Sequence, residues 1–487
     1  MDLAVMDLGV LGVVTDQVAH LRDKIQANDL ATDTMWVVVA AILVMFMQAG
    51  FAFLEIGFSR QKNVGTVIAK ILMNFSICAV VFWAVGFALG FSGDAGSIIG
   101  NTGFALNSDN VVKDFPGLAF SQVGLSGKWF FEFVFCAVSL AIVWGTTLER
   151  IKFGVYFIYA IVFSAIIYPL IAHWLFSYGW LAADLGSQDF AGSTVVHLTG
   201  ATGALAVLLL LGPRRGKYGP DGKPNVIPGH SMPFVGLATL ILWFGWFGFN
   251  PGSTLSALSS TGQNGDIRFA DIALVTNIAA ACGVLGALAT IWLKTRKPDI
   301  GMACNGAIAA LVAITAPSGY VNPWAATIIG FVAGIIVVVG VLAIEKVLDD
   351  PVGALSAHGL AGVWGTLACG LFTDPTLATL NGVGEGGLVY TGSMDQFFAQ
   401  AAAVGAAFAT VFALSFATFF AIKATIGLRV KPEEENYGLD MAEHGMWGYP
   451  EQFMPVPGYE YHQPAPPAGR PAPRPAPIGL GASEGMP

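Results

Sequence analysis

Charged side chains are scarce in this sequence. Of 487 residues, 11% are Asp, Glu, Lys or Arg, whereas a soluble domain has roughly 25%, so the chain cannot cover itself with polar surface. Cysteine is scarce as well, because five cysteines stand singly inside apolar runs and form neither a disulfide framework nor a zinc spacing. No basic patch of the kind that binds nucleic acid is present, so no nucleic-acid partner is expected.

Apolar runs of transmembrane length recur along most of the chain. Hydrophobic residues make up 55% of the sequence, and each run can cross a hydrocarbon core of about 30 Å as a helix with its backbone hydrogen bonds satisfied. The 60 glycines are typical of helices that pack closely in a bilayer. We predict an all-α membrane protein with eleven transmembrane helices, which begin near Met35, Val67, Lys128, Val155, Ala191, Pro233, Phe269, Gly301, Pro323, Ala354 and Gln396.

Composition divides the chain into four parts. Residues 1–33 carry six aspartates and lack a basic segment followed by an apolar core, which predicts an acidic extracytoplasmic leader and no signal peptide. Residues 34–424 form the membrane domain, and residues 425–457 are predicted to be a cytoplasmic regulatory tail. Residues 458–487 are Pro-rich and predicted to be disordered.

Basic residues occur in alternate loops, which predicts orientation because such loops stay on the cytoplasmic side. With an odd number of spans, the N-terminus lies outside and the C-terminus inside. We expect a multi-pass protein of the plasma (inner) membrane. The basic loops contain Arg60 and Lys62, then Arg150 and Lys152, then Arg214, Arg215, Lys217 and Lys223, then Lys294, Arg296 and Lys297, then Lys346.

An internal repeat places two histidines at matched positions. Asp189 precedes His197 by eight residues, and Asp350 precedes His358 by the same distance. Five spans separate the two segments, so the halves have opposite orientation, as in the inverted repeats of many transporters. A histidine eight residues along a helix from an interfacial aspartate lies about 12 Å deeper. Both imidazoles are therefore expected well inside the membrane.

Two buried imidazoles favour the handling of ammonium, ammonia or protons, because a neutral imidazole can both donate and accept a proton. A single such histidine could equally be a polar side chain that bonds a neighbouring helix. A metal site would need further Cys, His or carboxylate ligands at that depth, and none is visible, so neither metal nor cofactor is expected. The other histidines, His20, His173, His230, His444 and His462, are interpreted as structural or solvated.

Several long motifs in order resemble the ammonium transporter (Amt/Mep/Rh) family, in its bacterial Amt form. The resemblance runs from about Met35 to Pro450 and implies a homotrimer of eleven-span subunits, each with its own pore, in which His197 and His358 are the twin histidines. The motifs are FLEIGFSRQKN (53–63), DFAGSTVVH (189–197), GWFGFNPGS (245–253), NGAIAALVAITA (305–316), DDPVGALSAHGLAG (349–362) and GLRV…GLD…HG…YP in the tail.

The resemblance also implies roles for aromatic residues. Phe135 and Phe249 match the stacked phenylalanines that close the outer end of the pore, and Phe131 lies nearby in the vestibule. With 35 phenylalanines in the chain, any one of them is as readily explained by packing or by lipid contact.

Three further positions match the family's outer pocket. Trp246 and Ser253 correspond to groups that meet ammonium as it loses water, where a cation over aromatic rings gains about 0.5–2 kcal/mol. Asp189 matches the acidic residue near that pocket; an ordinary helix N-cap explains it equally well.

Two positions depart from the family pattern. Phe176 stands where relatives commonly carry a tryptophan over the recruitment pocket, and Trp174 and Trp180 are neighbours that one helical register cannot both aim there. Glu132 stands where many relatives carry glutamine, which places an ionisable group beside Phe131.

The sequence thus predicts an ammonium transporter and not an enzyme. Ammonium binds at the outer mouth and is deprotonated, and ammonia passes the histidines with or without the proton. An ammonium sensor that signals through the tail is the alternative, although the last 60 or so residues are too short for an appended domain. In relatives, PII-type regulatory proteins close the cytoplasmic exit, where the segment from Gly427 to Pro450 would pack.

Overall fold

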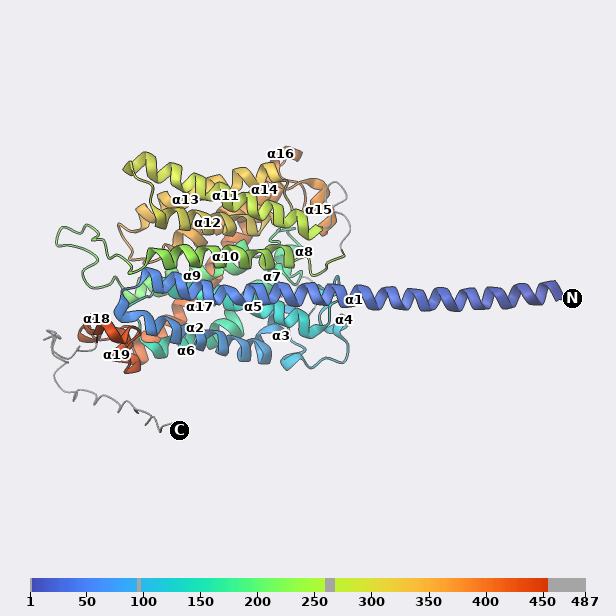
Figure 1. The fold of residues 1–487 in the computed structure, drawn as a ribbon, viewed down its shortest axis with the longest axis horizontal. Coiled ribbons are helices and arrows are strands. Elements are labelled where there is room, and N and C mark those ends of the chain that lie inside the picture. The colour runs from blue at the N-terminus through green and yellow to red at the C-terminus, as the bar shows by residue number, and fades with distance from the viewer. Residues whose placement is uncertain (1, 94–97, 259–267, 454–487) are drawn as a thin grey trace, which may run out of the picture.

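All regular structure in the described part of the chain is helical. The computed structural model describes residues 2–93, 98–258 and 268–453, with the backbone alone for residues 2–12, 451 and 453. Across these ranges, extended pairing is limited to the isolated bridges Ile151–Arg429 and Tyr218–Pro224. The predicted all-α class is confirmed (Figure 1).

Ten helical segments among the described residues are long and apolar enough to cross a membrane. The expected span near Gly301 is α12 (Ile300–Thr315), an apolar helix of 16 residues and about 24 Å, which is short for a crossing. A multi-pass helical protein is therefore established, and eleven crossings stay a prediction. The ten segments are Val13–Phe58, Gln61–Phe91, Leu125–Gly145, Phe153–Ala183, Ser193–Leu211, Met232–Gly252, Arg268–Thr295, Pro323–Ile344, Leu355–Phe372 and Asp395–Thr425.

Ten of the eleven expected starts lie within three residues of an observed helix start. The main elements are α1 (Asp2–Phe58), α2 (Val64–Val81), α3 (Phe87–Phe91), α5 (Leu125–Gly145), α6 (Phe153–Val162), α7 (Tyr168–Leu175), η6 (Ser193–Leu198), α9 (Thr199–Leu211), α10 (Met232–Gly252), α11 (Arg268–Thr295), α12, α13 (Pro323–Ile344), η9 (Leu355–Leu360), α14 (Ala361–Phe372) and α17 (Asp395–Thr425). The short α-helices are α4 (Val111–Asp114), α8 (Trp180–Ala183), α15 (Pro375–Asn381), α16 (Leu388–Thr391), α18 (Pro432–Tyr437), α19 (Leu439–His444) and α20 (Pro450–Phe453).

The first helix differs from expectation. α1 is continuous from Asp2 to Phe58, so the expected boundary between leader and first span at residue 33 falls inside it. No proline interrupts this segment, and Asp33 does not cap a helix there; its carboxylate accepts hydrogen bonds from Ser256 Oγ and Ala257 N instead. Figure 1 shows α1 projecting from the bundle. We call that end the stalk end, and the opposite end, where residues 428–448 pack, the tail end.

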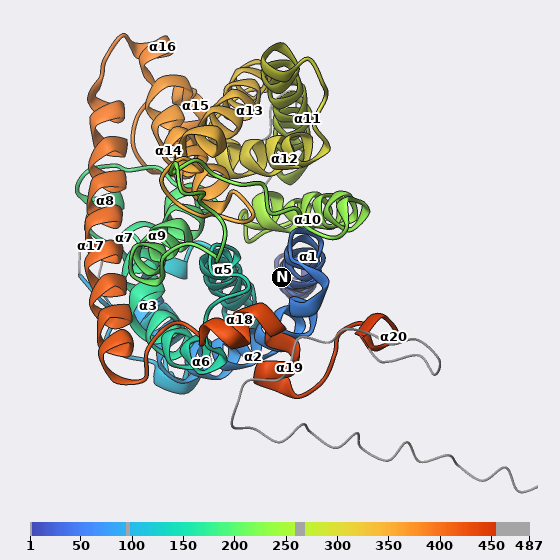
Figure 2. The same ribbon diagram turned by 90° about the vertical axis from the view of Figure 1, so that its left-hand side faces the viewer.

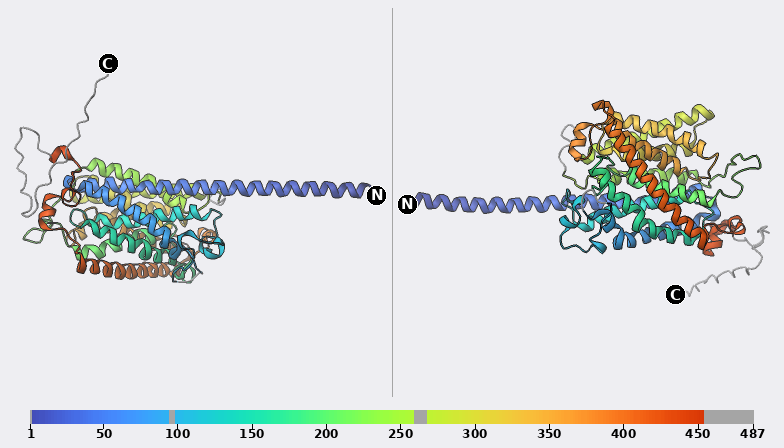
Figure 3. Two further views of the ribbon diagram at one scale, coloured as in Figure 1. Left: turned by 90° about the horizontal axis from the view of Figure 1, so that it is seen from below. Right: turned by 180° about the vertical axis from the view of Figure 1, so that it is seen from behind.

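Small residues bring helices of the second half into backbone contact. A Cβ atom on Gly283 (α11), Gly306 (α12) or Gly334 (α13) would overlap backbone atoms of the neighbouring helix. Figure 2 shows α11 to α14 grouped on one side of the bundle and α2 to α9 on the other. The last long helix, α17, packs on both α9 and α14 and crosses the flank of the bundle (Figure 3). The two halves are thus held around a shared interior.

Candidate functional site

The two repeated segments fold in the same way. Asp189 accepts hydrogen bonds from the backbone N–H of Gly192, Thr194 and Val195 at 2.9–3.0 Å, and Asp350 accepts from Gly353 and Leu355 at 3.1 and 2.8 Å. Each aspartate therefore satisfies the free donors at a helix start. Asp189 thus bonds the free backbone donors at the start of η6, although Gly192 occupies the N-cap position itself.

Each cap leads through a glycine into a wide helical turn that carries a histidine. Gly192 and Gly353 have φ of +114° and +77°, a left-handed backbone that a side chain would strain. The π-helical segments η6 and η9 follow, and they contain His197 and His358. π-helical turns often occur at functional sites. The predicted repeat is present as matched local geometry.

The histidines face each other inside the bundle. Their Nδ1 atoms lie 3.2 Å apart, the rings are 5.3 Å apart at 23°, and both side chains are buried. A hydrogen bond between two Nδ1 atoms needs one donor and one acceptor. One neutral imidazole then presents Nε2 as an acceptor, and the other presents Nε2–H as a donor. Nε2 of His197 has no hydrogen-bond partner among the described residues.

Aromatic rings continue from the histidines toward the stalk end. His197 stacks on Phe249 at 5.6 Å, Phe249 on Phe135 at 4.0 Å, and Phe135 lies 4.6 Å from Phe131. All three phenylalanines are buried. We call the line from Phe131 through Phe135, Phe249 and His197 to His358 the central column. The predicted pore residues are brought together in the predicted order.

Polar groups hold the column in place. Trp246 stacks on His197 at 5.3 Å and donates from Nε1 to Thr315 Oγ1 at 2.9 Å. Ser253 Oγ donates to the carbonyl of Phe249 at 2.9 Å, and Ser139 Oγ donates to the carbonyl of Val196 at 2.7 Å. Thr315 and Ser139 were not predicted. Each could have been identified from the sequence as a polar side chain inside an apolar run.

Two cavities lie at the stalk end of the column. The larger, of about 280 Å³, is lined by residues that include Asp189, Ser253 and Arg268. The smaller, of about 60 Å³, is lined by Leu118, Phe120, Phe131, Glu132, Phe135, Phe176, Phe190, Ser253 and Leu255. Phe120, Phe176, Phe190 and Ser253 line both, so the cavities adjoin.

Of Phe176, Trp174 and Trp180, only Phe176 lines these cavities. Trp174 and Trp180 line neither of them; they meet each other at 5.5 Å, and Trp174 donates to the carbonyl of Ile98 at 2.9 Å. Neither tryptophan therefore takes the place of Phe176 at the cavities.

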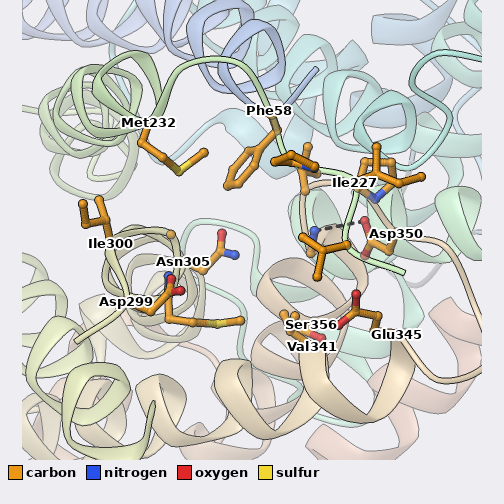
Figure 4. Close-up of a pocket in the computed structure, with 18 of the residues that line it drawn as sticks. Phe58, Ile227, Met232, Asp299, Ile300, Asn305, Val341, Glu345, Asp350 and Ser356 are labelled. Atoms are coloured by element: carbon orange, nitrogen blue, oxygen red, sulfur yellow. Dashed lines mark hydrogen bonds between the residues drawn. The ribbon is translucent and has the colours of Figure 1, made fainter. Parts of the chain in front are cut away.

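A cavity of about 620 Å³ opens at the tail end. Its lining includes Phe58 from the end of α1, Met232 from the start of α10, and Asn305, Asp350 and Ser356 around η9 (Figure 4). Ser356, two residues before His358, has a buried hydroxyl without a partner among the described residues. The small stalk-end cavity thus touches the central column at Phe131 and Phe135, and the tail-end cavity reaches Ser356 of η9, the segment that carries His358.

A buried ionic network ties the halves together near this cavity. Arg214 donates to both carboxylate oxygens of Asp349 at 2.8–2.9 Å and lies 3.6 Å from Glu149. Arg150 donates to the carbonyls of Leu148, Gly212 and Asp349 at 2.9 Å. Arg150 and Arg214 were identified from the sequence only as basic loop residues that predict orientation. Nothing local in the sequence indicated that Asp349 and Glu149 are their partners.

This network sets the protonation of its acids. Burial raises the pKa of Glu149, but hydrogen bonds and charges from Arg60 and Arg214 outweigh it, so the pKa stays below its usual value. Burial also raises the pKa of Asp349, and its hydrogen bond to Arg214 and the charge of Arg150 bring that pKa below its usual value. Both acids are therefore ionised at neutral pH.

The tail packs on loops at the same end. Val430 N donates to the carbonyl of Arg150 at 3.1 Å, and Lys152 N donates to that of Leu428 at 2.9 Å. Asp440 accepts from the backbone of Gly65 and Thr66 at 2.9 Å. The tail is thereby tied to the start of α2 and to the loop after α5.

The remaining histidines take structural or surface positions. His173 is buried and bonds the carbonyl of Gly90 through Nδ1 at 3.2 Å, and His230 bridges the carbonyl of Ser59 and Tyr449. His20 is exposed on α1 and His444 stacks on Phe153, whereas His462 lies outside the described residues. Within the described ranges, no three His, Cys, Asp or Glu side chains cluster as metal ligands would.

The fold is that of a polytopic helical membrane protein whose interior holds a column of buried aromatic rings and two buried imidazoles. The Ammonium Transporter Family model matches residues 35–449. The chain belongs to this family.

Relatives and solved structures agree with this assignment. Ammonium transporter Amt2 of Archaeoglobus fulgidus is 46% identical over 434 residues, covering 87% of this chain and 89% of the relative. The ammonium transporter of Bacillus subtilis is 33% identical, covering 86% of this chain and 99% of the relative. A structure described as a sensor Amt protein superposes with a TM-score of 0.77 at 36% identity, covering 86% of this chain and all of that one. Candida albicans Mep2 superposes with a TM-score of 0.73 at 29% identity, covering 83% of this chain and 87% of that one.

Proposed function

We propose that this protein transports ammonium across a membrane by conducting ammonia along the central column. The observation that carries the proposal is the unbroken line of buried rings from Phe131 to the His197–His358 pair, with a cavity at its outer mouth. Ammonium binds in the outer cavities, where Ser253 and aromatic faces replace part of its water shell. It loses its proton near Phe135 and Phe249, and ammonia continues along the imidazoles.

Electrostatics supports deprotonation at this point. A bare cation in a low-dielectric lumen costs several kcal/mol even after relaxation, whereas neutral ammonia carries no such cost. The Nδ1-linked pair offers one acceptor and one donor at Nε2, which suits a molecule that both accepts and donates hydrogen bonds. The proton either follows by a separate route, giving net charge transfer, or returns outside.

Current and flux measured on the purified full chain in liposomes test the proposal. An ammonium gradient is expected to drive ammonia flux, and a current accompanies it if the proton follows. His197→Ala is expected to lower flux at least tenfold, because it removes one member of the pair. His20→Ala, on the exposed part of α1, is the matched control and should transport normally. Equal flux in wild type and His197→Ala would refute the role of the pair.

A sensor is the second candidate, favoured by the similarity to a structure described as a sensor Amt protein and by the tail's contacts with the bundle. In this case ammonium binds, and its occupancy changes the contacts of residues 428–448. Binding without measurable flux in the same liposomes would favour the sensor.

The likeness to ammonium transporters supports a proposal for placement and assembly. We propose a homotrimer in the plasma (inner) membrane, with the stalk end outside and the tail end in the cytoplasm. A PII-type protein would then bind at the tail-end cavity of about 620 Å³, beside the packed tail. Native mass spectrometry tests the trimer, and a pull-down with a PII protein, compared between the full chain and a chain ending at residue 427, tests the partner.

A further inference from the structure

Glu132 is a buried acid at the outer mouth that the transport pathway described above does not use. It follows Phe131 on α5, is 5% exposed, and lines the cavity of about 60 Å³ together with Phe135 and Phe176. Its Oε2 atom is enclosed and has no hydrogen-bond partner among the described residues. An enclosed, unpaired carboxylate oxygen is costly unless the acid is neutral or a bound group supplies the missing hydrogen bond.

Nearby cations in the described structure are occupied elsewhere. Lys128, one helical turn earlier, donates to the carbonyls of Leu118 and Ser121 at 2.6 and 2.8 Å. Arg268, in the larger cavity, donates to the carbonyl of Gly319 and to Asn381. No described salt bridge includes Glu132.

We propose that Glu132 is a direct ligand of ammonium in the small cavity. An ammonium N–H donates to the carboxylate in a charge-assisted bond, while the faces of Phe131, Phe135 and Phe176 surround the cation. The cavity has room for a group of the size of water or ammonium. This inference rests on the proposed function, and it adds a charged residue to the site where the ion loses its water.

The proposal explains two departures from the family pattern together. Tryptophan attracts a cation more strongly than phenylalanine does, so Phe176 weakens the aromatic part of the site. A carboxylate at position 132, where relatives commonly carry neutral glutamine, restores attraction for a cation. The two positions line the same cavity, so each substitution compensates for the other.

Ammonium binding to the purified full chain tests the assignment. The measurement is thermal stabilisation by ammonium chloride against sodium chloride at equal ionic strength, from which the dissociation constant follows. Glu132→Gln keeps the shape and is expected to raise the dissociation constant about tenfold or more, because a hydrogen bond to a charged acceptor is lost. The half-saturating ammonium concentration for flux should rise in the same ratio.

Two further variants separate charge from packing. Glu132→Asp keeps the charge and is expected to bind ammonium more tightly than Glu132→Gln, whereas a packing role predicts the reverse because the shorter side chain leaves a gap. Glu385→Gln makes the same chemical change at an exposed site on the stalk end and should bind as wild type does.

The outcomes for site and function are distinguishable. A dissociation constant for Glu132→Gln within twofold of wild type overturns the ligand role, as does a wild type that ammonium does not stabilise. If wild type binds ammonium, Glu132→Gln binds it more weakly, and no variant or wild type conducts, then the Glu132 site stands while the transport proposal fails.

Discussion

Replacing Asp349 by asparagine should destabilise the protein more than any single surface change. Asp349 accepts from the guanidinium of Arg214 through both oxygens and from its backbone N–H at 2.7 Å, and it lies 3.9 Å from Arg150. Asp349→Asn keeps the shape of the side chain but removes its negative charge. Among the described residues, Glu149 is then the carboxylate that remains near the buried Arg150 and Arg214.

Removing one partner of a buried pair costs about 3–5 kcal/mol, because the remaining charge is left without compensation. The control is Asp221→Asn, which breaks the Lys223 pair at 3.2 Å; both side chains are exposed, so its loss should leave the free energy of unfolding close to that of wild type. Denaturant unfolding of the full chain in detergent compares the two. A cost for Asp349→Asn no larger than that of the control would refute the view that this network joins the halves.

Three further predictions concern the packing of α13 on α11, the attachment of the tail, and the buried acids Glu149 and Asp349. Gly334→Leu should prevent close approach of α13 to α11 and abolish the monodisperse size-exclusion peak; a normal elution profile would contradict that packing. Asp440→Asn should speed proteolysis of the tail by about tenfold, because charge-assisted bonds to the backbone are lost; an unchanged rate would show that other contacts hold the tail. The pKa values of Glu149 and Asp349 lie lower in the folded chain than in the unfolded one. Their stabilisation is therefore fully present above the unfolded-state pKa values of about 4 and is lost as pH falls below them through the lower folded values, so the unfolding midpoint should begin to drop at about pH 4; a midpoint that does not change with pH would contradict this.

Helix positions were predictable because apolar runs and their breaks are local properties of the chain. The start expected near Pro323 coincides with that of α13, and the one expected near Ala354 lies one residue from η9. The exception is α1, since acidic composition at residues 1–33 indicates solvent exposure but does not end a helix that has no proline in it. Composition predicts where a segment lies better than it predicts where its helix stops.

The column was predictable from motifs, and its partners were not. His197 and His358 are 161 residues apart, and only their repeated context marked them as a pair. The bonding of Asp349 to Arg214 joins segments 135 residues apart, and no local pattern encodes their contact. The sequence alone identified Phe176 as a departure from the family pattern. Only the fold shows that Phe176 lines both outer cavities.

The length of α1 makes it possible to determine by labelling which side of the membrane the stalk end faces. Its 57 residues extend about 85 Å, nearly three times the hydrocarbon thickness of about 30 Å. Val13 is 58% exposed and stands about 30 Å along the helix axis from Asp33. A single cysteine placed there would meet a membrane-impermeant reagent well away from the mouth of the column, and four of the five native cysteines are buried. A label on the projecting helix can therefore show which compartment the stalk end faces without any change to the residues of the central column.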